Sequence, residues 1–331
     1  MSSKKVAIFG CKTTTIFLIE NLIKKIQISR VITIDANMAL KNDVADYADI
    51  RNICSIYGIP IYTVRSYTLK SKEDQIFFEN EKFDLSFVIG WQRLIPESVL
   101  NTFSIGAFGM HGSSMDLPLG RGRSPMNWAI IEGKGQFYTN LFKYDPGVDS
   151  GDVLDTLKFQ ITPFDNAESM HLKNTLSMIH LLNKNLNILL ENNFILKKQN
   201  LLTQPTFYPK RNPSDSLIDW RQDILSIERF IRAVAPPFNG AYSFLNNKVK
   251  LIIAEAHIFD FSDFDYKDSQ VGMIVQVFPN RRLLIKCYGG LLFVKLFLCD
   301  IDPVVNDILV SDINLISNFK RNSQGNFDLE V

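Results

Sequence analysis

Short apolar runs alternate with helically spaced apolar residues in the first third of the chain. Three runs, each bounded by polar residues or glycine, predict buried strands at 5–10 (KVAIFG), 31–35 (VITID) and 85–89 (LSFVI). The stretches between them predict helices at 15–25, 44–57 and 72–80. Strands separated by helices are typical of βαβ units, so an α/β domain with a mostly parallel sheet is expected.

A second pattern marks a long helix and then a boundary. Leucine and isoleucine recur at spacings of three and four at positions 172, 176, 179, 182, 186 and 189. This predicts a helix with one face packed on the sheet. The pattern stops near 199–209, where prolines appear. We therefore expect two domains, 1–200 and 201–331.

The second domain carries a different pattern. A short helix is predicted at 226–235. Five short strands are predicted at 242–245, 248–257, 271–278, 283–287 and 291–296, with turns at Pro279-Asn280 and Gly289-Gly290. Five strands in this length suggest a small, all-β barrel.

Charge and composition restrict the class of partner and compartment. The 331 residues contain 36 Lys and Arg against 35 Asp and Glu, a formal charge of +1. This balance disfavours a nucleic-acid partner. No run approaches the ~20 apolar residues that span a bilayer, so no membrane partner is expected. The four cysteines lack metal-ligand spacing, and reduced thiols in a cytoplasmic protein are expected.

The first predicted strand leads into Gly10-Cys11-Lys12-Thr13-Thr14-Thr15. This loop lacks the second and third glycines of a dinucleotide fingerprint, so we reject a nicotinamide site. An anion at the following helix N-terminus is the weaker remaining interpretation.

The stretch 106–155 carries the candidate chemistry. An apolar run delivers His111, and a later stretch, expected to be a loop, delivers four aspartates, at positions 145, 149, 152 and 155. A histidine beside a carboxylate suits proton transfer, whereas the plainer interpretation is a strand-end histidine and solvated turn aspartates. The aspartate spacing also mimics a metal-binding helix face, but Pro146-Gly147 and Gly151 interrupt any helix, so no metal is expected.

The motifs of this stretch resemble a known family. His111-Gly112-Ser113, Leu117-Pro118, Arg121-Gly122 with Ser124-Pro125, and 147–152 (GVDSGD) look like the signature of 10-formyltetrahydrofolate-dependent formyltransferases. A second cluster at 211–220 (RNPSDSLIDW) and 232–240 (RAVAPPFNG) resembles their C-terminal region, and is most similar to enzymes that formylate amino sugars on nucleotides. The resemblance implies a Rossmann-like formyltransferase domain followed by an OB-like domain.

The resemblance also implies catalytic roles. Members use an Asn, a His and an Asp, and by position the last two are His111 and Asp149. The Asn normally stands two residues before the His, where this chain has Gly109. Removal of one oxyanion donor costs about 10²- to 10³-fold in rate elsewhere. We expect a replacement donor, for which Asn127, Ser113 and a backbone N–H are the candidates.

Binding residues follow from the same resemblance. For 10-formyltetrahydrofolate, the co-substrate, they are Gly90, Trp91, Gln92, Arg93 and Leu94, with Asp145 and Val148. For the acceptor they are Ser113, Arg121, Arg123, Lys210 and Arg211. Two alternatives stay open: Trp91 and Leu94 as core residues, and the basic residues as salt-bridge anchors.

We therefore expect an N-formyltransferase acting on the amino group of a nucleotide-linked amino sugar in polysaccharide biosynthesis. The main alternative is methionyl-tRNA formyltransferase, which the absence of basic residues at 201–209 disfavours. A folate hydrolase is a third enzyme class. Because of Gly109, a catalytically silent folate- or sugar-nucleotide-binding homologue is a fourth. Dimers are common among the enzymes it resembles, and the sequence leaves the oligomeric state open.

Overall fold

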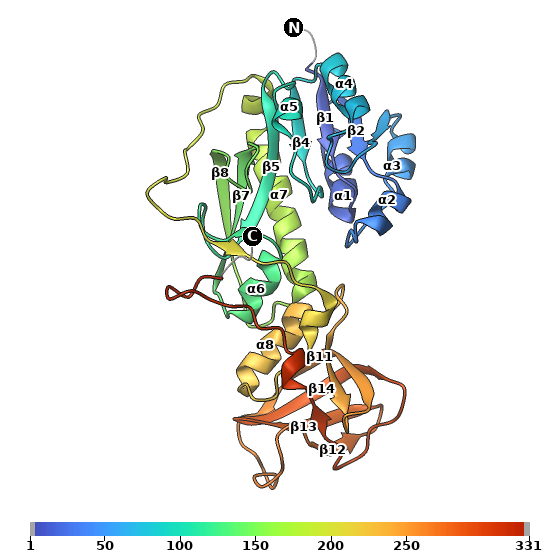
Figure 1. Cartoon of the computed structure of the whole chain (residues 1–331), viewed down its shortest axis with the longest axis vertical. Coiled ribbons are helices and arrows are strands. Elements are labelled where there is room, and N and C mark those ends of the chain that lie inside the picture. Colours follow the sequence, from blue (N-terminus) through green and yellow to red (C-terminus); the bar gives the residue numbers. More distant parts are fainter. Residues whose placement is uncertain (1–3, 328–331) are drawn as a thin grey trace.

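Two β-sheets divide the chain (Figure 1), which is described over residues 4–327 in a computed structural model. The first sheet has the order β3-β2-β1-β4-β5-β7-β8. Its strands are β1 (Val6–Phe9), β2 (Ile28–Thr33), β3 (Ile61–Thr63), β4 (Leu85–Val88), β5 (Gly106–Ser113), β7 (Gln136–Lys143) and β8 (Val153–Gln160). The five strands from β3 to β5 are parallel, and β7 and β8 continue the sheet in antiparallel register.

Helices cover both faces of this sheet. They are α1 (Thr13–Leu22), α2 (Ala36–Lys41), α3 (Arg51–Ile56), α4 (Lys72–Glu81), α5 (Glu97–Leu100), α6 (Pro125–Ile131) and α7 (Ala167–Leu190). Residues of α1, α3 and α7 share one apolar cluster with β1, and residues of α2, α4 and α5 share another. All four residues of β1 are buried because alternate side chains enter the two clusters. This confirms the expected α/β layer with a mostly parallel sheet.

Two predicted helices differ from the structure. The helix expected at 44–57 is confined to α3, and residues 44–50 form a loop in which Asp46 has a left-handed φ of 57°. On α7, Leu172 and Leu176 are 60% and 62% exposed, although we expected them to face the sheet. The buried face instead carries polar residues such as Asn174, whose Oδ1 accepts a hydrogen bond from Thr139 Oγ1 at 2.8 Å. The spacing of the leucines therefore predicted the wrong residues for part of the buried face of α7.

The second sheet is antiparallel, with the order β12-β13-β14-β11-β10-β15. Its strands are β10 (Ala241–Leu245), β11 (Val249–Asp260), β12 (Ile274–Phe278), β13 (Arg282–Cys287), β14 (Gly290–Cys299) and β15 (Leu309–Val310). A bridge between Met273 and Ile308 and the 2.8 Å bond from Leu309 N to Gly272 O join its two edges. The expected all-β second domain is confirmed, with a sixth strand that the sequence pattern did not indicate.

Helix α8 (Ile224–Val234) lies between the two sheets (Figure 1) and holds them together. Asn127 of α6 donates through Nδ2 to Ala233 O at 2.7 Å, and this bond is buried. Arg232 donates to the carbonyl of Asp165 at the start of α7. One buried and one part-buried polar contact therefore supplement the apolar packing of α8 on the first domain.

The C-terminal segment returns to the first domain after the barrel (Figure 1). Phe319 and Phe327 pack on Trp128 of α6, with ring centroids 4.8 Å and 4.4 Å away. Arg321 Nη2 lies 2.6 Å from a carboxylate oxygen of Glu132. A short strand pair, β6 (Arg121–Gly122) with β9 (Phe207–Tyr208), ties the interdomain connection to the same region. None of the described helices is long and apolar enough to cross a membrane.

Asp165 gives the domain junction a pH dependence that can be tested. Burial by itself would raise its pKa, but hydrogen bonds from Lys173, Thr162 and Ser169 hold the pKa of this carboxyl below its ordinary value. Its contribution to stability is therefore present above the unfolded-state pKa near ~4 and is lost as pH falls through the lower folded-state pKa. We expect Asp165→Asn to lower the free energy of unfolding by about 1–3 kcal/mol at pH 7.

Urea unfolding at several pH values measures this effect. The difference between Asp165→Asn and the wild type should shrink as pH falls below ~4. Asp268→Asn, at an exposed position, is the matched control and should be neutral. A pH-independent difference would show that the charge of Asp165 contributes nothing.

Candidate active site

His111 lies where the first sheet changes direction. β5 pairs with β4 only as far as Gly109 and continues alongside β7, so His111 stands beyond the carboxyl end of β4. Open α/β sheets bind their ligands at this edge. The imidazole is 6% exposed. The fold therefore places a nearly buried titratable group at the edge where a ligand is expected.

The structure brings His111 and Asp149 together. His111 Nδ1 lies 3.3 Å from Asp149 Oδ2, which also accepts a hydrogen bond from Gly122 N at 3.0 Å. On the other side of the ring, Nε2 lies 2.7 Å from Gly120 O. Both ring nitrogens face acceptors, so only a ring with two protons donates to both. This pair can hold a proton between an imidazole and a carboxylate.

Gln199 fixes the loop that presents Asp149. Its Nε2 donates to Asp149 O and to Gly151 O, each at 2.8 Å, and Arg121 Nη2 donates to its Oε1 at 2.6 Å. These bonds hold Asp149 in a left-handed conformation with a φ of 49°. No sequence pattern pointed to Gln199. The contact of Arg121 supports its interpretation as an anchor of the loop.

The space above Gly109 is filled by Tyr144. A Cβ at position 109 would lie 2.1 Å from Tyr144 Cε2 and 2.9 Å from Val88 O. The tyrosine ring is held by stacking on Phe142, with centroids 5.1 Å apart, and by the bond from its own N to Ala107 O. Burial and, secondarily, Asp149 raise the pKa of Tyr144. Glycine at position 109 is therefore a steric requirement of this site.

Asn140 lies directly opposite His111 in the β5–β7 ladder. It is fully buried, and its Oδ1 accepts a hydrogen bond from Thr156 Oγ1 at 2.6 Å. Within residues 4–327 its Nδ2 has no hydrogen-bond partner. Sequence reasoning overlooked Asn140 and Tyr144 because strand register decides which side chains neighbour His111.

The segment expected to bind folate has a buried half and an exposed half. Trp91 is 8% exposed and packs edge-on against Phe9 and Tyr67, with centroids 5.7 Å and 4.7 Å away. Gln92 N donates to Tyr67 Oη at 3.0 Å. Leu94, by contrast, is 51% exposed. Trp91 thus matches the core alternative, and the exposed half stays available to a ligand.

Lys12 and Arg123 lie near Arg93 of this segment. Lys12 follows β1, and its Cβ and Cγ lie next to Gly90. Burial lowers the pKa of Lys12, and Arg123 lowers it further, although Asp46 partly offsets this. Burial, and then Arg93, lower the pKa of Arg123. Cations that lie close enough to lower one another's pKa form a site that favours an anion.

The aspartate-rich segment does not form one cluster. Asp145 accepts hydrogen bonds from Gly147 N and Ser150 Oγ within its own turn. Asp155 lies within β8, contrary to the expected loop, and accepts from Asn185 Nδ2 at 2.8 Å. Val148 is 41% exposed at the loop tip. Across residues 4–327, no group of three or more His, Cys, Asp or Glu could hold a metal.

Of the three candidates for the replacement donor, the two side chains are engaged elsewhere. The Asn127 amide is bonded to Ala233 O at the domain junction. Ser113 is fully buried, and its Oγ faces Gly120 and lies 3.4 Å from Met115 N. Neither contact joins these residues to His111.

Lys210 and Arg211 also make structural contacts. Lys210 pairs with Asp43 at 3.3 Å. The Arg211 guanidinium lies over Trp128 and Phe319, 4.9 Å and 5.5 Å from the ring centroids. Burial lowers the pKa of Arg211 to about 10. These contacts support the anchoring interpretation for both residues.

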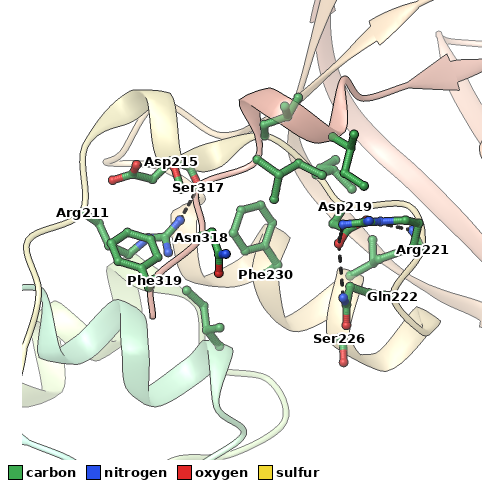
Figure 2. A pocket seen from close by; sticks show the side chains of 16 residues that line it. Arg211, Asp215, Asp219, Arg221, Gln222, Ser226, Phe230, Ser317, Asn318 and Phe319 are labelled. Carbon is green, nitrogen blue, oxygen red and sulfur yellow. Dashed lines mark hydrogen bonds and ion pairs between the residues drawn. The ribbon is translucent and has the colours of Figure 1, made fainter. Parts of the chain in front are cut away.

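Figure 2 shows the cavity that Arg211 lines, between α8 and the returning C-terminal segment. Its volume is about 650 Å³. Asp219 pairs with Arg221 on one wall, and Phe230 and Phe319 form another. Neither His111 nor Asp149 lines it, so it is separate from the candidate active site.

The sequence matches two families at the positions that these domains occupy. Residues 4–178 match the family described as "Formyl transferase", and residues 210–297 match "Formyl transferase, C-terminal domain". The first match alone covers more than half of the chain. The chain belongs to the formyl transferase family. It is a formyl-transferring enzyme.

Solved structures share the fold of this formyltransferase. An N-formyltransferase from Helicobacter canadensis, in complex with folinic acid and dTDP-3-aminofucose, is 17% identical with a TM-score of 0.63, over 88% of this chain and 99% of that chain. WlaRD, a sugar 3N-formyl transferase in the presence of dTDP and 5-N-formyl-THF, is 16% identical with a TM-score of 0.63, over 95% and 100%. HypX from Aquifex aeolicus, in complex with tetrahydrofolic acid, is 15% identical with a TM-score of 0.59, over 88% of this chain and 44% of that chain.

The steric constraint at Gly109 can be measured in the formyltransferase. We expect Gly109→Ala to lower the free energy of unfolding by about 1–3 kcal/mol because its Cβ overlaps the Tyr144 ring. Combining it with Tyr144→Ala should cost less than the sum of the two single changes, as residues in contact are coupled. Denaturant unfolding of the four proteins gives the coupling.

Gly135→Ala is the matched control, since nothing lies within 4 Å of a Cβ at that position. Its unfolding should match the wild type. Additive costs for Gly109→Ala and Tyr144→Ala would rule out the proposed contact.

Proposed function

We propose that this enzyme transfers a formyl group from 10-formyltetrahydrofolate to the amino group of a nucleotide-linked amino sugar. The observation that carries the proposal is the contact of His111 with Asp149 at 3.3 Å, at the ligand-binding edge of a formyltransferase catalytic domain. Residues 1–200 would form the catalytic domain. Residues 201–331 would form a C-terminal OB-like domain.

The reaction requires one net proton transfer. The amine nitrogen donates its lone pair to the formyl carbon, and the carbonyl oxygen takes up the displaced electron pair. When the tetrahedral intermediate collapses, the bond from carbon to folate N10 breaks and N10 keeps that pair. The amine loses a proton and N10 gains one, so the number of protons is unchanged over the reaction. We assign this transfer to His111, with Asp149 orienting the ring and stabilising its charge.

Folate binding is assigned to residues 90–94, with Asp145 and Val148 on the facing loop. The support is position: the segment follows β4 at the carboxyl edge of the sheet, and Leu94 and Val148 expose apolar side chains there. The solved structures with folinic acid, 5-N-formyl-THF and tetrahydrofolic acid agree with a folate co-substrate.

The sugar nucleotide is assigned to the cations at the same edge. Lys12 and Arg123, next to Arg93 of the folate segment, provide positive charge suited to a pyrophosphate. Arg121 and Ser113 would contribute to sugar-nucleotide binding indirectly, by holding the loops that they contact in place. The sugar-nucleotide ligand of the Helicobacter canadensis relative favours this acceptor class.

Methionyl-tRNA formyltransferase is the second candidate function, since it shares both domains. The near-neutral charge and the lack of basic residues at 201–209 weigh against it. The unpaired state of all four cysteines suits a reducing cytoplasm, where we place the reaction within polysaccharide biosynthesis.

Transfer itself is the first test. Purified enzyme is incubated with 10-formyltetrahydrofolate and a panel of nucleotide-linked amino sugars, with methionyl-tRNA as a further acceptor. We expect formylation of at least one sugar and none of the tRNA. Steeply salt-dependent formylation of tRNA would instead support the second candidate. Binding of folate without transfer to any acceptor would contradict the proposal and indicate a silent homologue.

His111→Asn tests the assigned proton carrier. We expect it to abolish transfer, while the affinity for a folate analogue, measured by calorimetry, stays within a few-fold of the wild type. Asparagine keeps a hydrogen-bonding side chain but cannot exchange a proton near neutral pH. Near-normal turnover by this variant would show that His111 does not carry the proton.

Arg123→Gln tests the anion site. We expect the KM for the sugar nucleotide to rise by about tenfold or more, corresponding to the loss of a charge-assisted bond of about 1.5–3 kcal/mol. The KM for folate should change little. Arg281→Gln, in the barrel, is the matched control. Equal changes in both variants would exclude a specific role of Arg123.

A further inference from the structure

Formyl transfer creates a negative charge on the formyl oxygen, and an enzyme accelerates the step when a fixed donor meets that charge. The donor in this chain is unassigned. Position 109 has no side chain, and the Asn127 and Ser113 side chains make other contacts. The inference below rests on the proposed function and names the missing donor.

Asn140 has the required position. The register of β5 and β7 sets Asn140 directly opposite His111. Directly opposed residues of an antiparallel pair project from the same face, with Cβ atoms about 4.5–5.5 Å apart. The amide of Asn140 and the imidazole of His111 therefore lie side by side on the same face of the sheet.

Asn140 also has an unused donor. The side chain is fully buried, and its Nδ2 has no partner within the described chain. Leaving a buried amide N–H unpaired costs the full desolvation penalty of that group. Buried polar groups are nearly always paired, so an exception calls for a functional explanation. A ligand oxygen that arrives next to His111 would provide the partner.

Thr156 orients this donor. Its hydroxyl donates to Asn140 Oδ1 at 2.6 Å from the neighbouring strand β8. Because Oδ1 is held on the β8 side, the NH₂ group is directed away from Thr156. The orientation is set before substrate binds, which is what an oxyanion donor needs.

We propose that Asn140 Nδ2 binds the formyl oxygen and stabilises its negative charge in the tetrahedral intermediate. The amine nitrogen bonds to the formyl carbon, the carbonyl pair moves to oxygen, and the N–H of Asn140 meets it without giving up its proton. On collapse the carbonyl re-forms, N10 leaves with its electron pair, and it receives the proton that the amine has lost.

Tyr144 explains why the donor comes from β7. Its ring occupies the space over Gly109, so no side chain from that position of β5 reaches the site. Its hydroxyl is a rival donor, since a raised pKa keeps it protonated. However, Tyr144 is stacked over Gly109, whereas Asn140 lies opposite the catalytic histidine itself.

The test compares Asn140→Ala, Thr156→Val and Tyr144→Phe with the wild type. Asn140→Ala should lower kcat and kcat/KM together by about 10²- to 10³-fold, since an interaction made only in the transition state is lost. The affinity for a folate analogue should stay within a few-fold. Tyr144→Phe keeps the ring and should retain turnover within a few-fold.

Thr156→Val is the matched structural control. It breaks the same hydrogen bond as Asn140→Ala but keeps the amide, so the two variants should lose similar stability in thermal unfolding. Its loss of kcat should remain well below that of Asn140→Ala. Equal losses of kcat in Thr156→Val and Asn140→Ala would show that Asn140 has only a structural role, which would overturn the inference.

The remaining outcomes are also decisive. Full turnover by Asn140→Ala, or the main loss in Tyr144→Phe, overturns the assignment of Asn140 while wild-type transfer keeps the proposed function intact. A wild type that binds folate and formylates no acceptor overturns the proposed function, and the role of Asn140 with it. The two failures are therefore distinguished by the wild-type assay alone.

Discussion

The antiparallel pairing of β5 with β7 is the interaction on which the active site depends. The sheet is parallel up to β5, and a further parallel strand would require a crossover helix on one face. Instead the chain passes through β6 and α6 and returns antiparallel, which sets β7 against the far half of β5, extending beyond the end of β4. His111 thereby gains Asn140 as its neighbour, and the loop after β7 brings Asp149 back to the imidazole.

The second constraint is the fixed conformation of that loop. Asp149 reaches His111 from a left-handed backbone conformation, which a non-glycine residue adopts only when its surroundings hold it there. Gln199 supplies two hydrogen bonds for this purpose from a segment after α7, and Arg121 holds Gln199. Gln199 and Arg121 thus help to determine the distance between His111 and Asp149.

Much of the fold could be predicted from the sequence, because hydrophobic runs and helical spacing report burial directly. The β1 run and the barrel strands are examples. The candidate pair His111 and Asp149 could be selected through family motifs. The roles of Gln199, Tyr144 and Asn140 could not, because each depends on strand register or on a contact between distant segments. Leu172 and Leu176 show the converse, since in that part of α7 the polar residues Asn174 and Ser177 are buried while both leucines are exposed.

The bond between His111 Nε2 and Gly120 O has a consequence for how the enzyme treats its folate. With Nδ1 directed at Asp149, neither ring nitrogen is open to solvent or to an incoming molecule. A bound formylfolate would meet an imidazole that is already occupied at both ends. For His111 to carry the proton in the proposed reaction, the segment around Gly120 would have to move away from Nε2.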